Sequence, residues 1–136
     1  MKPADIPSTV LLADDEQILL ISYRDYLEDC GFRVIAVEDA AGVERHAAES
    51  DILVVDVRLP TERLEGLEVI AKLIASDALA PRIPVIFMSV LSEDDDISQK
   101  KLQEFSQLRN RYLWLQKPFE GELLAKKIRD QMAASR

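Results

Sequence analysis

Short apolar runs recur five times along the chain, and longer amphipathic stretches separate them. Each run is four to six residues long and lacks the strict apolar and polar alternation of a half-exposed strand. Such a run predicts a strand that is covered on both faces. The predicted strands are Val10–Ala13, Phe32–Val37, Asp51–Asp56, Val85–Met88 and Tyr112–Leu115.

The stretches between the runs carry apolar residues at helical spacing. Helices are predicted from Glu16 to about Cys30, from Asp39 to about Glu49, around Leu67–Ile74, from Glu93 to about Leu108 and around Leu123–Met132. In the first helix the predicted core stripe consists of Leu19, Tyr23, Tyr26, Leu27 and Cys30. Gly31 is expected to end that helix as a C-terminal cap.

Strand and helix therefore alternate through the chain. This order predicts an α/β fold with a doubly wound five-stranded parallel sheet, helices on both faces and right-handed crossovers. The length of 136 residues favours one domain. We expect an N-terminal leader over residues 1–7 and a single domain over residues 8–134.

Composition narrows the range of functions. A net charge of −8 argues against nucleic-acid binding, because a surface that follows phosphates needs clustered Lys and Arg. The single cysteine, Cys30, excludes an intramolecular disulfide and fits a reducing compartment. The sequence lacks an apolar run of about 18 residues and an apolar signal-peptide core, so we expect no membrane span and a cytoplasmic location.

Polar side chains with chemical potential stand at the ends of four predicted strands: Asp14 with Asp15, Asp56, Ser89 and Lys117. Taken singly, each has an ordinary explanation, as a helix cap, a turn residue or a solvated cation. The carboxyl ends of parallel strands meet at one edge of a sheet, where ligands bind in open α/β folds. The joint pattern therefore predicts one functional site.

The residue types at this edge suit phosphoryl chemistry. Clustered carboxylates repel one another, and a hard cation such as Mg²⁺ relieves that repulsion through oxygen ligands. A carboxylate can attack phosphorus to form an acyl phosphate. The transferred group carries negative charge, which Lys117 and the metal would offset, while Ser89 could donate a hydrogen bond to it.

With these residues in place, the chain resembles the receiver domain of bacterial two-component response regulators over about residues 8–134. The match includes Asp14-Asp15, Asp56 with the loop to Pro60, Ser89, and Lys117-Pro118-Phe119. The resemblance implies a flavodoxin-like receiver fold with strand order 2-1-3-4-5. It also implies that Asp56 accepts a phosphoryl group from a histidine kinase or a histidine phosphotransfer protein.

The resemblance implies further roles for single residues. Asp15, Asp56 and the main-chain carbonyl of Arg58 would hold Mg²⁺, with Asp14 acting largely through water, and the Lys117–Pro118 bond would be cis. On phosphorylation Ser89 would move toward the phosphoryl group and Trp114 would turn inward behind it. Such a domain promotes its own phosphorylation and dephosphorylation, is otherwise no enzyme, and signals to a downstream protein or an attached output domain.

Several positions depart from the family pattern. Val90 stands where a small residue is usual, so its branched side chain could restrict donors and phosphatases. The loop from Asp56 to Gly66 is about two residues longer than usual and contains Glu62, Arg63 and Glu65. The segment between Ser89 and Lys117 is also long, so the fourth helix is expected to be extended or shifted.

The first helix has a second apolar feature. Ile18, Leu20 and Ile21 fall off its predicted core stripe. They are either scattered surface hydrophobics or a docking patch for a partner helix or a second copy in a homodimer.

The same residues bear on three other functions. A haloacid-dehalogenase-type phosphatase needs a second Asp two positions after the first, where this chain has Arg58, and the chain is short for that class. A receiver-like module that binds proteins without phosphorylation stays open. A flavodoxin-like nucleotide site is excluded, because Asp14-Asp15 replaces the glycine-rich phosphate loop after the first strand.

Overall fold

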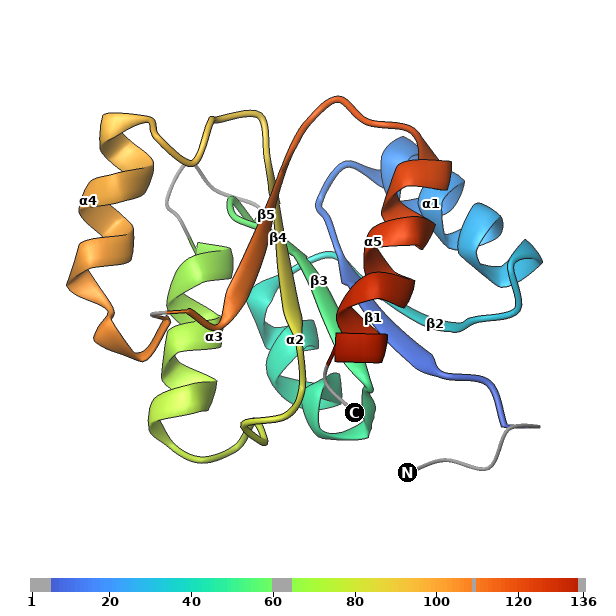
Figure 1. Ribbon diagram of the computed structural model, residues 1–136, viewed down its shortest axis with the longest axis horizontal. Helices are drawn as coiled ribbons and strands as arrows, with labels where there is room; N and C mark the ends of the chain where they lie inside the picture. Colours follow the sequence, from blue (N-terminus) through green and yellow to red (C-terminus); the bar gives the residue numbers. More distant parts are fainter. Residues whose placement is uncertain (1–5, 60–64, 109, 135–136) are drawn as a thin grey trace.

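The computed structural model describes residues 6–59, 65–108 and 110–134. Its five strands form one parallel sheet in the order β2-β1-β3-β4-β5, which confirms the expected topology (Figure 1). The strands are β1 (Thr9–Ala13), β2 (Arg33–Val37), β3 (Ile52–Asp56), β4 (Val85–Ser89) and β5 (Tyr112–Gln116). Their carboxyl ends lie toward the top of Figure 1.

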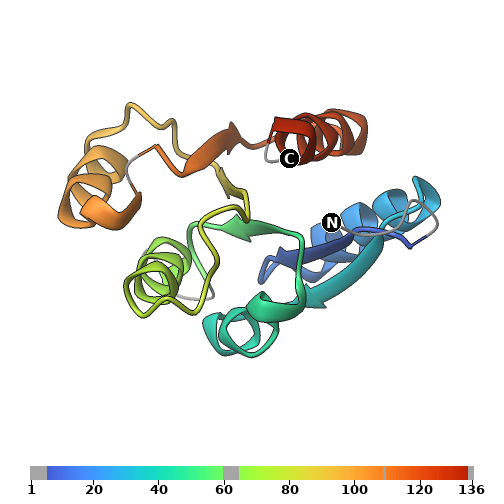
Figure 2. The same cartoon turned by 60° about the horizontal axis from the view of Figure 1, so that its bottom comes forward.

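The helices cover both faces of this sheet (Figure 2). They are α1 (Gln17–Asp29), α2 (Ala40–His46), α3 (Glu65–Ala75), α4 (Asp96–Glu104) and α5 (Gly121–Ala134), with 3-10 turns at Ala47–Glu49 and Ser106–Leu108. Helices α1 and α5 pack side by side on one face, and α2 and α3 pack together on the other. In the described part of the chain, no helix is both long and apolar enough to cross a membrane.

Alternate residues of the central strands face opposite sides of the sheet, as strand geometry requires. Leu11, Leu53 and Val55 join the core beneath α2 and α3, while Leu12 and Val54 join the core beneath α1 and α5. Every residue of β1, β3 and β4 is buried. Burial on both faces explains why these strands are uninterrupted apolar runs.

The core face of α1 differs from the predicted stripe. Its buried residues are Leu20, Tyr23 and Leu27, whereas Tyr26 is 40% exposed. The prediction was wrong for Leu20, which packs into the core, and for Tyr26, whose ring lies over Gly121 of α5. The helix ends as predicted at Gly31, which adopts a φ of +97°.

The fourth helix is shorter than predicted. Asp95 caps it by accepting a hydrogen bond from the backbone N–H of Ile97 at 2.9 Å, and the helix ends before Phe105. The upstream acidic residues belong to a turn in which the Ser92 hydroxyl accepts from Asp94 N–H. The expectation that α4 is extended was therefore wrong, and the alternative that it is shifted stays a prediction. Residues 60–64 of the loop that was predicted to be long, with Glu62 and Arg63, lie outside the described residues.

Candidate functional site

Asp56 ends β3 and is held by hydrogen bonds to both carboxylate oxygens. Its Oδ1 accepts from the backbone N–H of Arg58 at 2.9 Å, and its Oδ2 accepts from Lys117 Nζ at 2.5 Å. The next residue, Val57, donates its N–H to the carbonyl of Met88 at 2.9 Å, which ties the loop to β4. Asp56 is only 8% exposed, so a largely buried carboxylate is fixed at the edge of the sheet.

Asp14 and Asp15 follow β1 at the same edge. Asp14 is fully buried, and its two oxygens accept from Glu16 N–H at 2.9 Å and from Lys117 Nζ at 2.7 Å. Asp15 is exposed. One carboxylate oxygen from each of Asp14, Asp15 and Asp56 lies within 4.8 Å of the others. The structure therefore brings together the three carboxylates that the sequence pattern placed at one site.

Lys117 reaches this cluster from the end of β5. Its backbone N–H donates to the carbonyl of Ser89 at 2.7 Å, and the Lys117–Pro118 peptide is cis, as expected. Its side chain is 8% exposed and its ammonium bridges Asp14 and Asp56. Burial lowers the pKa of Lys117, but its hydrogen bonds to the two carboxylates outweigh burial and raise that pKa overall.

The charge at the site is not balanced by Lys117. Burial raises the pKa of Asp56, although hydrogen bonds from Lys117 and from the Arg58 N–H oppose this shift. One ammonium thus faces three carboxylates whose oxygens are close together. Clustered carboxylate oxygens with excess negative charge are the donor set that Mg²⁺ prefers, so these residues fit a divalent cation.

Ser89 ends β4 next to this cluster and is 2% exposed. Its Oγ accepts a hydrogen bond from the backbone N–H of Leu91 at 3.0 Å. The hydroxyl hydrogen is not used in that bond, so it remains a donor. Val90, which follows, is 62% exposed and projects away from the core. Its predicted effect on donors and phosphatases stays a prediction.

Three side chains of β5 hold the loop that follows Ser89. Trp114 Nε1 donates to the carbonyl of Leu91 at 3.0 Å, and Gln116 Nε2 donates to the carbonyl of Val90 at 3.3 Å. The Tyr112 hydroxyl donates to Glu93 Oε2 at 2.7 Å. We call Tyr112, Trp114 and Gln116 the β5 clamp. Sequence reasoning singled out only Trp114, although spacing by two places all three on one face of the strand.

Gly66 is a second feature that the sequence pattern did not reveal. Its N–H donates to the carbonyl of Val57 at 2.8 Å, so α3 begins directly against the site loop. A Cβ at this position would lie 2.0 Å from the carbonyl oxygen of Asp56. Only glycine allows this close approach of two backbones.

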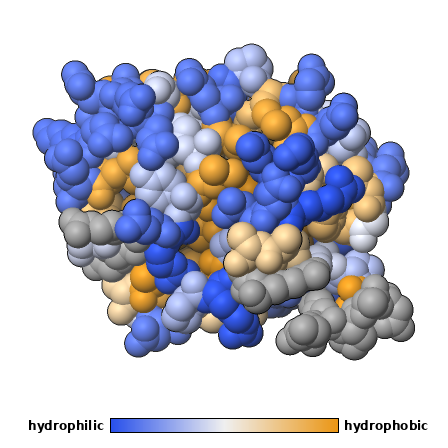
Figure 3. Space-filling model, viewed as in Figure 1, coloured by the Kyte–Doolittle hydropathy of each residue, from blue (hydrophilic) through white to orange (hydrophobic). Residues whose placement is uncertain are grey.

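The predicted apolar strip on α1 is only partly exposed. Ile18 is 82% exposed and Ile21 is 47% exposed, whereas Leu20 is buried. The exposed pair lies on the first turns of α1, shortly after Asp14 and Asp15 in the chain. By contrast, the outer surface at the α4 end of the molecule is mainly hydrophilic (Figure 3).

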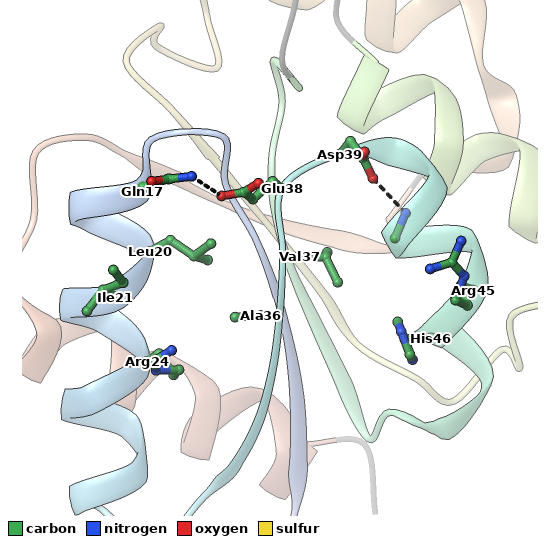
Figure 4. A pocket seen from close by; sticks show the side chains of 11 residues that line it. Gln17, Leu20, Ile21, Arg24, Ala36, Val37, Glu38, Asp39, Arg45 and His46 are labelled. Atoms are coloured by element: carbon green, nitrogen blue, oxygen red, sulfur yellow. Dashed lines mark hydrogen bonds between the residues drawn. The ribbon is translucent and has the colours of Figure 1, made fainter.

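A separate hollow lies along the outer edge of β2, between α1 and α2 (Figure 4). Both of its acidic side chains already accept hydrogen bonds: Glu38 accepts from Gln17 at 2.7 Å, and Asp39, which caps α2, accepts from Gly42 N–H at 2.8 Å. The acidic cluster is not among its lining residues. We therefore assign the chemistry to the carboxyl edge of the sheet and not to this hollow.

Comparison with known proteins matches this architecture. A family model described as the response regulator receiver domain matches residues 10–129. Protein RcaC from Microchaete diplosiphon is 33% identical over 130 residues, which cover 94% of this chain but only 19% of that protein. The chain therefore spans a minor part of the length of this relative.

Solved structures agree. A response regulator receiver protein from Sinorhizobium medicae is 25% identical with a TM-score of 0.74, covering 96% of this chain and 98% of that one. A CheY-like response regulator receiver domain protein from Methanospirillum hungatei has a TM-score of 0.75 at 19% identity, covering 96% and 97%. The second likeness concerns the fold alone.

Proposed function

This chain belongs to the response regulator receiver domain family, and we propose that it accepts a phosphoryl group on Asp56 in a phosphorelay. The observation that carries this proposal is the bridge made by the Lys117 ammonium between the carboxylates of Asp14 and Asp56. The bridge places a fixed positive charge beside a nucleophile that is largely buried. A fixed charge of this kind is what phosphoryl transfer needs.

In the proposed reaction an oxygen of Asp56 attacks the phosphorus of a phosphohistidine. A carboxylate O–P bond forms as the P–N bond breaks, and the imidazole leaves with the electron pair. Lys117, already within hydrogen-bond distance of Asp56, offsets negative charge on the transferred group. The product is an acyl phosphate on Asp56.

Receiver domains bind Mg²⁺ at an acidic pocket, and the residues here suit it. We assign Asp15, Asp56 and the main-chain carbonyl of Arg58 as ligands, with Asp14 contributing largely through water. The bound metal would offset carboxylate repulsion and the charge of the incoming phosphoryl group.

The response to phosphorylation is assigned to Ser89 and the β5 clamp. Movement of Ser89 toward a phosphoryl oxygen would break its hydrogen bond with Leu91 N–H. The carbonyl of Leu91 accepts from Trp114, so a displacement of the freed Leu91 would weaken this second hydrogen bond and allow Trp114 to turn inward. The signal would thus pass from Asp56 to the face formed by β5 and the loop before α4.

Proteins of this family interact with histidine kinases and output domains. We propose that a histidine kinase or a histidine phosphotransfer protein docks at Ile18 and Ile21, which are exposed on the first turns of α1, shortly after Asp14 and Asp15 in the chain. The alternative occupant of this patch is a second copy of the chain in a homodimer. The downstream partner is a separate target protein or an attached output domain, and DNA is not a partner of this acidic chain. We place the domain in the cytoplasm.

A receiver-like module that binds proteins without phosphorylation is the alternative function. Val90 beside Ser89 is the feature that favours it. The two functions differ in one outcome, covalent modification of Asp56.

The test is intact-protein mass spectrometry after incubation with a small acyl phosphate and Mg²⁺. The wild-type chain should gain one phosphoryl group, and Asp56→Asn should gain none. Asp25→Asn, at an exposed position on α1, is the matched control and should behave as wild type. An unmodified wild-type chain with every donor would reject the proposal and support the binding module.

A further inference from the structure

Tyr23 of α1 contacts the connection between β5 and α5, although it is remote from that connection in sequence. Its ring stacks on Phe119 with centroids 5.3 Å apart and an angle of 8° between the planes. Its hydroxyl donates to the carbonyl of Phe119 at 3.1 Å. Tyr23 is 5% exposed, so this contact is part of the core beneath α1 and α5.

Phe119 stands two residues after Lys117. The connection is therefore anchored on both sides of the lysine: Lys117 N–H binds the carbonyl of Ser89 on β4, and the Phe119 carbonyl binds Tyr23 on α1. These two anchors determine where the Lys117 backbone leaves the sheet. In Figure 1 this connection runs along the top of the molecule and descends beside α1.

The Tyr23 hydroxyl also lies within electrostatic reach of the site. Burial raises the pKa of Tyr23, and the charge of Lys117 is the main influence that opposes it. Asp14, the other partner of Lys117, acts on the same hydroxyl. Tyr23 is thus close behind the lysine without being one of its hydrogen-bond partners among the described residues.

We propose that Tyr23 is a positioning residue for phosphoryl transfer, which holds the Phe119 carbonyl and so keeps Lys117 Nζ on Asp56. The inference rests on the proposed function, because it assigns Tyr23 a role through Lys117. It predicts that loss of the hydroxyl slows transfer to Asp56 without weakening the carboxylate cluster. The packing of the Tyr23 ring in the core contributes separately, to the stability of the fold.

The test uses Tyr23→Phe, which removes only the hydroxyl and keeps the stacked ring. Tyr26→Phe is the matched control, because Tyr26 lies on the same helix and its ring packs against Gly121 of α5. The initial rate of phosphorylation by a small acyl phosphate is measured for each, and Mg²⁺ affinity is measured by calorimetry. A merely structural defect would change both quantities.

We expect Tyr23→Phe to be phosphorylated roughly threefold to tenfold more slowly than wild type, as loss of one hydrogen bond implies. Its Mg²⁺ affinity should equal that of wild type, and Tyr26→Phe should match wild type in both. An unchanged rate for Tyr23→Phe, or a parallel loss of rate and Mg²⁺ affinity, would overturn the proposal.

A second measurement keeps this inference separate from the function. The side-chain ammonium resonance of Lys117 is followed by ¹H–¹⁵N NMR without donor or metal. It should shift in Tyr23→Phe and stay in place in Tyr26→Phe. An unshifted resonance in Tyr23→Phe rejects the positioning role even if wild type is phosphorylated. If wild type is not phosphorylated, the proposed function fails, while a shifted resonance still shows that Tyr23 positions Lys117.

Discussion

At the scale of single residues, Asp56 is unfavourable to stability in its ionised form. Burial raises its pKa, which means that the carboxylate releases its proton more readily in the unfolded chain than in the folded one. The protonated carboxyl of Asp56 therefore favours the folded state at low pH, and this stabilisation is lost as pH rises through the pKa of the folded state. Near neutral pH, ionised Asp56 destabilises the metal-free fold.

This sign leads to a prediction for Asp56→Asn. In EDTA at pH 7 the variant should melt at a higher temperature than wild type, because it keeps the acceptor oxygen without the buried charge. Lys117 keeps Asp14 as its partner. In Mg²⁺ at tenfold above its Kd, wild type should gain about 1.4 kcal/mol, and Asp56→Asn clearly less.

Differential scanning calorimetry of both proteins in the two buffers checks this. Asp25→Asn serves as the control, since its ion pair with Arg24 is exposed and such pairs contribute little to stability. A lower melting temperature of Asp56→Asn in EDTA, or an equal gain in stability from Mg²⁺ for both proteins, would contradict the claim that the buried charge of Asp56 destabilises the metal-free fold.

At the scale of elements, the start of α3 determines where Asp56 lies. Gly66→Ala would force a Cβ against the Asp56 carbonyl and should cost about 3 kcal/mol, with loss of phosphoryl acceptance. Gly31→Ala is the control: its φ of +97° strains alanine by about 1–2 kcal/mol, but no atom crowds the new Cβ. Urea unfolding and phosphorylation rates of the two variants are compared. Equal phosphorylation rates would contradict a role for Gly66 at the site.

The β5 clamp gives a prediction in alkaline solution. Burial, together with the hydrogen bond to Glu93, raises the pKa of Tyr112 to about 12. An unfolded Tyr ionises near its ordinary value of about 10, so this contribution to stability is complete below pH 10 and is lost as pH rises toward 12. The difference in the free energy of unfolding between wild type and Tyr112→Phe, measured with urea, should become smaller over that pH range. Parallel pH curves would contradict the buried hydrogen bond.

At the scale of the whole molecule, the sequence predicts what repeated patterns determine. Uninterrupted apolar runs indicate strands buried on both faces, and their alternation with helices implies a parallel sheet. The edge of that sheet then gathers Asp14, Asp56 and Lys117 whatever the details of packing. This is why the fold and the acidic cluster could be expected from the residues.

Features that depend on close contact could not be predicted in this way. The core face of α1 differs from the predicted one because Leu20 is buried and Tyr26 is not. A small rotation of the helix about its axis separates these two faces, and the apolar pattern of the sequence does not determine it. The predicted start of α4 at Glu93 was wrong because Asp95 caps the helix and is not part of it. The contact of Tyr23 with Phe119 joins segments whose distance apart in space no local pattern encodes.

The central claim is that Asp56 is the residue that carries the phosphoryl group. The most direct test is to treat the chain with a small acyl phosphate and Mg²⁺, reduce the product with borohydride, and sequence its peptides by tandem mass spectrometry. Reduction converts an aspartyl phosphate to homoserine and leaves free carboxylates unchanged. The account predicts homoserine at position 56 alone. Homoserine at Asp14 or Asp15, or an unmodified chain, would contradict it.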